Sequence, residues 1–185
     1  MRIISGALKG RTINFLKNAN TRPLKDAVKE NIFNIIEHSS LINVKVLKSD
    51  ILDLYSGIGS FGIECISRGA SKVTFVEKNI TAVSVLKENL INLSILEQSK
   101  IYNYKIEDFL VKLRDKFQIF FLDPPFKNND FLHNLKLIKD KKLFKKKHII
   151  IIHRETKTDD DLNDILKIIE TKKYGRSKII FGEFN

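Results

Sequence analysis

The sequence predicts an α/β fold: a three-layer sandwich built on a mainly parallel seven-stranded sheet that ends in an antiparallel hairpin. Strand-like apolar runs alternate with helix-like segments from residue 50 onward, and the runs at 118–123 and 148–153 are almost wholly apolar, which is typical of parallel strands covered on both faces. No linker, repeat or low-complexity segment divides the 185 residues. We therefore expect a single domain over 1–185, with an N-terminal tract and helix at 1–40 and an α/β core at 41–185.

The individual elements follow from residue patterns. Apolar residues at helical spacing predict a first helix over 26–38. Strands are expected at 50–55, 72–77, 100–106, 118–123 and 148–153, and further helices at 60–69, 80–93, 107–116, 129–140 and 159–170. Gly175 and Arg176 separate two strand-like runs within 171–184, which predicts the hairpin at the end of the sheet.

The composition indicates an ordinary soluble globular protein, with 43% hydrophobic and 30% charged residues. No apolar run approaches the roughly 20 residues that span a bilayer, and residues 1–11 lack the apolar core of a signal peptide. We therefore expect a cytoplasmic protein without a membrane partner. The single cysteine, Cys65, excludes a disulfide within the chain and is expected to fill the core, and no Cys/His cluster predicts a metal.

The charge balance favours a polyanionic partner. Lys and Arg number 33 against 22 Asp and Glu, which gives a formal net charge of +11. Such an excess favours nucleic acid through counterion release, although a generally lysine-rich surface would give the same balance. The lysine-rich run at 139–148 is expected to be a solvated helix end and loop rather than the binding face.

Three carboxylates lie at or near the ends of predicted strands: Asp53, Glu77 and Asp123. Ligands bind beyond the carboxyl ends of the strands in open α/β sheets. The sequence therefore predicts one pocket at this edge.

A glycine-rich turn follows the first predicted strand. Residues 57–62 form a G-x-G-x-x-G motif, in which Gly57 and Gly59 allow a tight turn and a close approach to a ligand. Glu77 can accept both hydroxyls of a ribose. A dinucleotide site uses the same geometry, so a nicotinamide-dependent oxidoreductase stays open. Asp53 favours S-adenosylmethionine, because a carboxylate suits an ammonium and a sulfonium charge but repels a pyrophosphate.

The strand at 118–123 ends in Asp123-Pro124-Pro125-Phe126. The carboxylate of Asp123 and the backbone carbonyl of Pro124 can each accept an N–H of an exocyclic amine, which directs its lone pair toward a methyl donor. The two prolines hold that carbonyl in an extended direction, and Phe126 offers a face on which a base can stack. The motif therefore predicts a methyltransferase acting on an amino nitrogen.

A family resemblance rests on five segments: "RIISGALKGR" (2–11), "TRPLKDAVKENIFN" (21–34), "ILDLYSGIGSFGIECISRGASKVTFVEKN" (51–79), "IFFLDPPF" (119–126) and "YGRSKIIFGEF" (174–184). Together they resemble the bacterial 16S rRNA (guanine(966)-N(2))-methyltransferase family over essentially the whole chain. The two N-terminal segments narrow the resemblance to this family.

The resemblance implies a Rossmann-like class I methyltransferase fold with S-adenosylmethionine as cofactor. It assigns Asp53, Gly57 and Gly59 to the methionine end of the cofactor and Glu77 to the ribose. It assigns Asp123, Pro124 and Phe126 to the group that holds the target amine, here called the amine clamp. It places Arg22 and Pro23 on an N-terminal flap beside the substrate.

This chain departs from the family pattern at the adenine pocket and at the fifth strand. Lys105 stands where the family often has an acidic residue for the adenine amine, so Asp108 is expected to substitute, with the backbone N–H of Ile106 serving the adenine ring. His153 ends the fifth predicted strand where the family usually has Glu, and we expect a core or rim histidine rather than a catalyst. The remaining departures are Leu24, Ala27 and Lys29.

We therefore expect an enzyme that methylates the exocyclic N2 amine of one guanine in 16S ribosomal RNA, presented in a partly or fully assembled small subunit, with no metal and as a monomer. The residues expected to hold RNA phosphates in the N-terminal tract are Arg2, Lys9, Arg11, Arg22 and Lys25. A DNA or RNA adenine-N6 methyltransferase is the near alternative, because the same clamp serves that amine. A non-catalytic RNA-binding module would fit the charge but leave the clamp unused.

Overall fold

The computed structural model describes residues 1–16, 24–125 and 130–185. Its strands are β1 (Asp50–Leu54), β2 (Lys72–Val76), β3 (Ser99–Tyr102), β4 (Phe117–Leu122), β5 (Phe144–Glu155), β6 (Leu166–Tyr174) and β7 (Ser177–Phe184). Its α-helices are α1 (Asp26–His38), α2 (Ser60–Ser67), α3 (Ile80–Asn92), α4 (Ile106–Lys112) and α5 (Asp130–Asp140), and a short 3-10 helix covers Leu96–Gln98.

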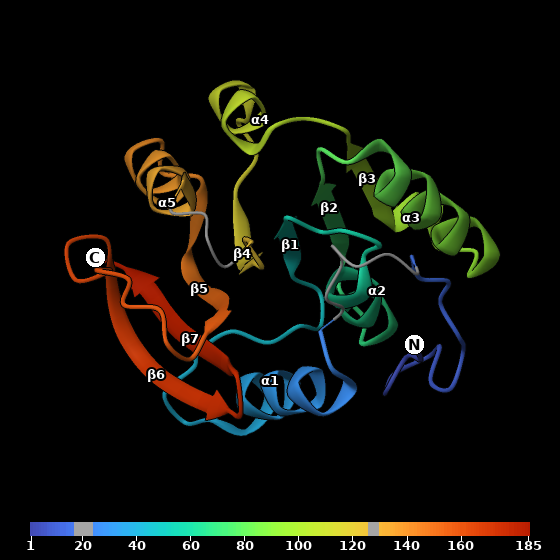
Figure 1. Ribbon diagram of the computed structural model, residues 1–185, viewed down its shortest axis with the longest axis horizontal. Coiled ribbons are helices and arrows are strands. Elements are labelled where there is room, and N and C mark those ends of the chain that lie inside the picture. The colour runs from blue at the N-terminus through green and yellow to red at the C-terminus, as the bar shows by residue number, and fades with distance from the viewer. Residues whose placement is uncertain (17–23, 126–129) are drawn as a thin grey trace.

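The strands form one seven-stranded sheet in the order β3-β2-β1-β4-β5-β7-β6 (Figure 1). The pairs among β1 to β5 are all parallel, and β7 pairs antiparallel with both β5 and β6. This arrangement confirms the predicted fold class, with a mainly parallel sheet that ends in an antiparallel hairpin.

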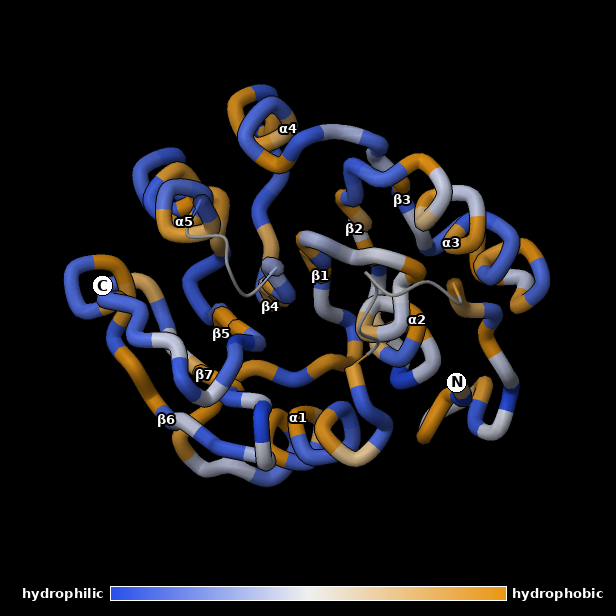
Figure 2. Tube along the Cα trace, in the orientation of Figure 1, coloured by the Kyte–Doolittle hydropathy of each residue, from blue (hydrophilic) through white to orange (hydrophobic). Residues whose placement is uncertain are grey.

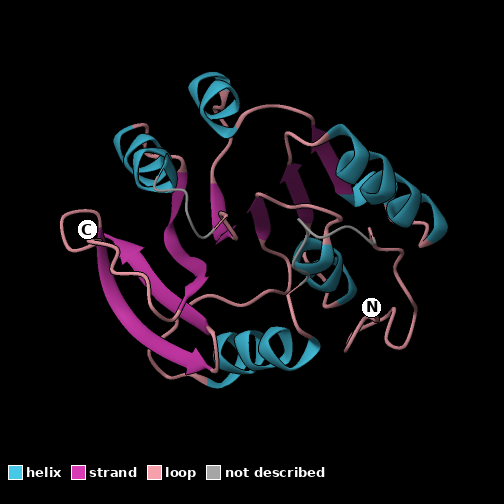
Figure 3. Cartoon of the chain, in the orientation of Figure 1, coloured by secondary structure: helices cyan, strands magenta, loops and turns pink. Residues whose placement is uncertain are grey.

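Helices cover both faces of the sheet (Figure 3). Successive side chains of a strand point to opposite faces, so Ile51 packs with α1, α2 and α3 whereas Leu52 packs with α4 and α5. In β4, Ile119 and Phe121 join the first cluster, and Phe120 and Leu122 the second. The helices have mixed hydropathy, as expected of elements with one buried face (Figure 2). The apolar runs of the sequence are therefore apolar because both sheet faces are buried.

The helix predicted at 159–170 is wrong. Residues 159–165 contain no helix, and β6 begins at Leu166. Leu162, Ile165 and Leu166 are buried at a spacing that mimics a helical face. The segment instead pairs with β7 from Leu166 opposite Phe184 to Tyr174 opposite Ser177, and these non-local hydrogen bonds override the local pattern.

Other boundaries differ by a few residues. The strand β3 ends at Tyr102 and α4 ends at Lys112, both earlier than predicted. The strand β5 begins at Phe144, so part of the lysine-rich run is strand rather than loop. This run lies at the amino end of the parallel strands, where Lys145 pairs with Asp50 at the start of β1. Within the described ranges, no helix is long and apolar enough to cross a membrane.

Candidate active site

The three predicted carboxylates meet at the carboxyl edge of the sheet. Leu54 at the end of β1 pairs with Val76 of β2 and with Leu122 of β4. Glu77 directly follows β2, and Asp123 directly follows β4. Both residues therefore flank the turn that follows β1. Asp53 lies in β1 itself, and its carboxyl group interacts electrostatically with both of the others. The parallel register thus gathers them from three sequence-distant segments.

The Asp53 side chain is buried and only partly satisfied. Its Oδ2 accepts a hydrogen bond of 3.0 Å from the backbone N–H of Gly62 in α2. Its Oδ1 is buried and has no hydrogen-bond partner in the part of the chain that the structure describes. Burial raises the pKa of Asp53 well above its ordinary value, and the nearby charges of Asp123 and Glu77 raise it further. A cationic hydrogen-bond donor on a ligand would pair with Oδ1 and would favour the ionised form of the Asp53 carboxyl group.

The glycine-rich turn adopts a backbone that favours glycine. Gly57 and Gly59 have φ angles of 54° and 84°, in the left-handed region. A Cβ at Gly59 would lie 2.4 Å from the Leu86 side chain, whereas a Cβ at Gly57 would meet none of the described residues within 4 Å. The neighbouring Ser56 hydroxyl oxygen is buried without a partner from the described residues. Gly59 is therefore needed for packing, and no described residue fills the space beside Gly57.

Glu77 joins the glycine-rich turn to the turn that follows β2 through two hydrogen bonds. Its Oε2 accepts a hydrogen bond of 2.9 Å from the Gly57 backbone N–H, and its Oε1 accepts one of 2.8 Å from that of Asn79. The Asn103 side chain in turn donates to the backbone carbonyl oxygens of Glu77 and Lys78. Each carboxylate oxygen can accept more than one hydrogen bond, so Glu77 keeps the capacity to bind hydroxyl groups beside Gly57.

Asp123 follows β4 directly and is held from the neighbouring strand. The register pairs Phe121 with Ile151 and Leu122 with Ile152, which brings Asp123 beside His153 near the carboxyl end of β5. The Nδ1 atom of His153 lies 2.9 Å from Asp123 Oδ1. Pro124 is buried and Pro125 exposed, whereas Phe126, the predicted stacking platform, lies outside the described residues.

Arg154 supports the proline turn from the opposite face of β5. Its guanidinium is buried, donates a 3.3 Å hydrogen bond to the Pro125 carbonyl oxygen and lies 4.5 Å from the centre of the Phe131 ring. Two further hydrogen bonds, of 3.0 and 2.9 Å, join it to the carboxylate of Asp160. Burial alone would raise the pKa of Asp160, but its hydrogen bonds from Arg154 and Thr158 outweigh burial and lower it. Sequence reasoning did not find Arg154, because its contacts depend on tertiary structure.

The residues that bear on the expected adenine pocket, Lys105, Ile106 and Asp108, lie at the start of α4. Ile106 is the first residue of α4, where the backbone N–H has no partner within the helix, and its side chain is buried. Lys105 and Asp108 are exposed. Glu107 is half-buried, and its charge acts on the Tyr55 phenol, which accepts a hydrogen bond of 2.9 Å from Asn134. Glu107 therefore lies nearer this side of the site than Asp108 does.

Tyr55 marks the beginning of the turn after β1. Its φ angle of 59° is in the left-handed region, which a side chain other than glycine rarely adopts. Burial, with smaller contributions from the surrounding charges, raises the pKa of its phenol to about 12. Such strained residues concentrate at functional sites, and the strain was not visible in the sequence.

Comparison with known proteins identifies the chain's family. The family model described as "Conserved hypothetical protein 95" matches residues 1–183. The ribosomal RNA small subunit methyltransferase D of Haemophilus influenzae is 35% identical over 158 residues, which cover 84% of this chain and 79% of that protein. Its counterpart in Buchnera aphidicola subsp. Baizongia pistaciae is 36% identical over 155 residues, covering 84% and 76%. The chain belongs to this methyltransferase family. The resemblance inferred from its motifs is confirmed.

A solved structure supports the fold of this methyltransferase family member. The Escherichia coli protein described as "Putative methyltransferase yhhF" superimposes with a TM-score of 0.83 at 24% identity, and the match covers 100% of this chain and 97% of that one. The likeness extends through the N-terminal tract to the final hairpin.

The N-terminal tract of the methyltransferase is fixed to α2 and α3. The backbone N–H groups of Ile4 and Ser5 donate to the Glu64 carboxylate in α2, and Arg11 donates to the Asn92 carbonyl oxygen at the end of α3. Asn14 forms hydrogen bonds with Asn89, whose side chain also donates to the Ile58 carbonyl oxygen in the glycine turn. The tract therefore runs between the far ends of these helices and the site.

The residues predicted to contact RNA lie at different places along the N-terminal part of the chain. Arg2, Lys9, Arg11 and Lys25 are exposed, and Arg22 lies outside the described residues. The segment that carries Lys9 packs on Ser67 at the end of α2, away from the carboxylates. The Arg2 backbone instead accepts a hydrogen bond from Lys29, which also donates to Ser60 at the start of α2. The Arg2 backbone is thus joined through Lys29 to the start of α2, which follows the glycine-rich turn.

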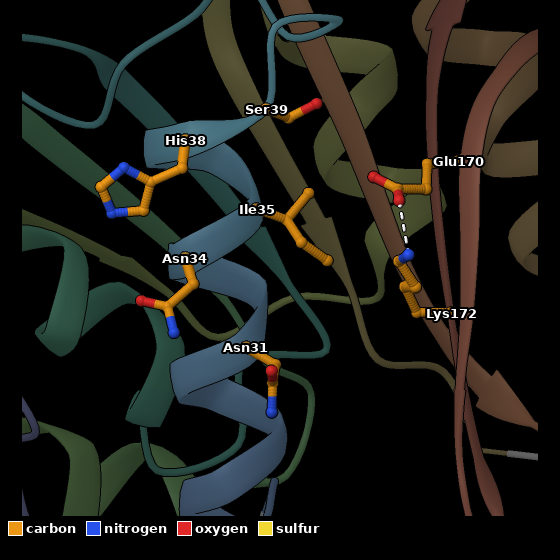
Figure 4. Close-up of a pocket in the computed structure, with 7 residues that line it drawn as sticks. All are labelled: Asn31, Asn34, Ile35, His38, Ser39, Glu170 and Lys172. Atoms are coloured by element: carbon orange, nitrogen blue, oxygen red, sulfur yellow. Dashed lines mark ion pairs between the residues drawn. The ribbon is translucent and has the colours of Figure 1, made fainter.

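A groove of about 480 Å³ lies elsewhere on the methyltransferase, between α1 and β6. Figure 4 shows Ile35 pointing from α1 toward the ion pair of Glu170 and Lys172. The other lining residues are Asn31, Asn34, His38 and Ser39, and none of the predicted site residues is among them. The described residues also contain no group of three His, Cys, Asp or Glu side chains arranged to hold a metal ion.

Proposed function

We propose that this protein transfers a methyl group from S-adenosylmethionine to the exocyclic N2 amine of a guanine in the 16S ribosomal RNA of the small subunit. The observation that carries the proposal is the position of Asp123, one strand away from the buried and partly unsatisfied carboxylate of Asp53. An amine acceptor and a cation acceptor thus lie side by side at one sheet edge. The names of the relatives, ribosomal RNA small subunit methyltransferase D, support the RNA substrate.

The residues at the turn after β1 fit the cofactor. Asp53 Oδ1 and Ser56 Oγ are buried polar atoms without partners in the described chain, and Gly57 leaves space for a ligand to approach the backbone. Glu77 is placed to accept the ribose hydroxyls, and Ile106 would serve the adenine ring. S-adenosylmethionine, when bound, supplies a methyl group on a positively charged sulfur, which suits the three carboxylates around it.

The chain's own contribution to the reaction is mainly positioning. Asp123 accepts one N–H of the target amine and the Pro124 carbonyl accepts the other, so that the nitrogen lone pair points toward the methyl group. Holding the two reactants in this orientation lowers the barrier without a strong base. After methyl transfer the nitrogen carries an extra proton and is strongly acidic, so Asp123 or water can take that proton. Phe126 is proposed to stack on the base.

The RNA must present its guanine unpaired and unstacked. Flipping a paired base costs a few kcal/mol, whereas a base that is already exposed costs least. A partly or fully assembled subunit would hold such a base in a fixed place, which lowers the ordering cost of binding. The basic residues of the N-terminal tract, with the net charge of +11, would hold the phosphates.

Tritiated methyl transfer tests this proposal. Purified protein is incubated with assembled small subunits and with the same RNA stripped of protein, at matched RNA concentration and salt, and the RNA is then digested to nucleosides. We expect label on N2-methylguanosine, with far faster transfer to assembled particles. Label on adenine N6 would contradict the guanine assignment, and equal rates would contradict the assembly requirement. Calorimetric titration with NAD separates the oxidoreductase alternative, for which we expect no binding.

A further inference from the structure

Asp123 belongs to a chain of hydrogen bonds that crosses three strands. His153 Nδ1 lies 2.9 Å from Asp123 Oδ1, and His153 Nε2 lies 2.9 Å from the Ser177 hydroxyl oxygen. Asp123 follows β4, His153 lies near the carboxyl end of β5, and Ser177 begins β7. Glu155 of β5 pairs with Ser177 and His153 pairs with Ile179, so the alternation of side chains places His153 and Ser177 on the same face.

The geometry fixes which ring nitrogen faces the carboxylate. A carboxylate oxygen can only accept a hydrogen bond, so Nδ1 of His153 must carry a proton and donate to Asp123. In the neutral ring, Nε2 is then the acceptor for the Ser177 hydroxyl. The hydrogen bond made by one ring nitrogen sets the protonation of the other. The Ser177 hydroxyl can donate to Nε2, and the contact holds the imidazole ring in the orientation that faces Asp123.

The two oxygens of Asp123 have different environments. Oδ1 is held by His153, whose side chain is 8% exposed, whereas the Asp123 side chain is 24% exposed. Oδ2 has no hydrogen-bond partner among the residues that the structure describes. An isolated aspartate at a strand end could rotate about two side-chain bonds and turn either oxygen to water. The histidine removes this freedom and leaves one oxygen for a substrate.

We propose that His153 is a positioning residue that holds the Asp123 carboxylate for the target amine, with Ser177 holding the other side of the imidazole ring. This inference rests on the proposed function of Asp123 as amine acceptor. The sequence led us to expect only a core or rim histidine at this position. The amine clamp is thus built by β5 and β7 as well as by the strand that carries Asp-Pro-Pro-Phe.

The kinetic test replaces His153 with phenylalanine, which fills similar space without a donor, and with asparagine, which keeps an N–H near the Nδ1 position. We expect His153→Phe to lower kcat by about tenfold to a hundredfold, because small displacements of a reacting group have effects of this size, while calorimetric affinity for S-adenosylmethionine is unchanged. His153→Asn should recover most of the lost kcat. Normal kcat in His153→Phe, or no recovery in His153→Asn, would overturn the inference.

The matched control is His148→Phe, the same substitution on the same strand. His148 lies in the amino-terminal half of β5, where Nδ1 contacts the Lys145 carbonyl oxygen and Nε2 accepts from the Phe184 backbone N–H. We expect His148→Phe to affect stability but not kcat. An equal loss of kcat in this variant would show that disruption of β5 alone explains the effect, which would also overturn the inference.

A spectroscopic measurement tests the contact without methyl transfer. In protein labelled with nitrogen-15 in histidine, assigned with the His153→Asn variant, we expect Nδ1 of His153 to carry the proton and Ser177→Ala or Asp123→Ala to shift its resonances. An unprotonated Nδ1, or resonances indifferent to Asp123→Ala, would overturn the inference. If the wild-type protein methylates no RNA guanine, the proposed function fails while this measurement still decides the His153 contact.

Discussion

The Nζ atom of Lys29 lies 3.7 Å from Oε2 of Glu64, and both side chains are completely buried. Glu64 also accepts the backbone N–H groups of Ile4 and Ser5 and a 2.9 Å hydrogen bond from Arg68. The pair therefore joins the N-terminal tract to α1 and α2. The family resemblance marked Lys29 only as a departure, and the structure gives it a role in holding this tract.

Lys29→Met is expected to destabilise the protein by about 1.5–3 kcal/mol, because Glu64 keeps Arg68 but loses its buried cationic partner, and the Arg2 carbonyl oxygen and the Ser60 hydroxyl lose their hydrogen-bond donor. Burial already lowers the pKa of Lys29, so the ammonium depends on Glu64 and Asp26 to stay charged. Urea unfolding measures the loss. The matched control is Lys25→Met at the exposed start of the same helix, for which we expect little change. Equal midpoints for the two variants would contradict the prediction.

Cofactor affinity is expected to rise with pH. Burial raises the pKa of Asp53, so at a pH below that raised value the free protein holds a proton there. A cationic ligand favours the ionised carboxylate, and its binding then releases the proton. Affinity should increase by up to one log unit per pH unit, beginning above the ordinary carboxylate range near pH 4, and level off beyond the raised pKa. Calorimetry in two buffers of different ionisation enthalpy measures the released proton. A variant with Asp53→Asn should show no such release.

Asp123→Ala should lower turnover by about a hundredfold or more, which corresponds to roughly 3 kcal/mol of lost transition-state stabilisation. Affinity for S-adenosylmethionine should change little, because Asp123 contacts the base rather than the cofactor. Single-turnover methyl transfer and calorimetry measure the two quantities separately. Asp115→Ala removes an exposed carboxylate near the start of β4 and serves as the control. Near-normal methyl transfer by Asp123→Ala would remove this residue from the mechanism.

Glu77→Ala should give the opposite pattern, with much weaker cofactor binding and a smaller effect on turnover at saturation. The substitution removes a charged acceptor, worth about 1.5–3 kcal/mol, and also frees the backbone N–H groups of Gly57 and Asn79. Asn103→Ala loosens the same turn without removing the carboxylate and separates the two effects. If Glu77→Ala binds the cofactor normally, the ribose does not meet the end of β2.

RNA binding should depend on basic residues of the N-terminal tract rather than on the lysine-rich run. Replacing Arg2 and Lys25 together by glutamine should reduce the slope of log affinity against log salt by about two, or less for single strands, if both contact phosphates. The matched control replaces Lys146 and Lys147, which are exposed at the amino edge of the sheet. A larger change in the control would place the RNA at that opposite edge.

The parts of the fold that the sequence predicts are those fixed by local pattern and burial. The run at 119–122 is continuously apolar because its side chains alternate between two buried clusters, and its strand was predicted within one residue. Gly57 and Gly59 were expected in a tight turn, and both have left-handed backbones. Asp53, Glu77 and Asp123 follow from the rule that parallel strands present their carboxyl ends at one edge.

The parts of the fold and of the site that the sequence does not predict depend on pairing between distant segments. Leu162, Ile165 and Leu166 have helical spacing, and only pairing with β7 turns the segment after them into a strand. The contact of His153 with Asp123 requires the register between β4 and β5, and that of Arg154 with Pro125 spans 29 residues of sequence. No local pattern encodes either contact.

The two outer strands of the sheet bear on self-association. An edge strand exposes unpaired backbone groups and can template pairing with another copy, which leads to aggregation. At one edge, β3 has only four residues. At the other, β6 has an irregularity between Ile168 and Glu170 and carries Lys167, Lys172 and Lys173. A short strand, a bulge and lysines each oppose the addition of a foreign strand, so the hairpin that supplies Ser177 to the site also protects the sheet from growing.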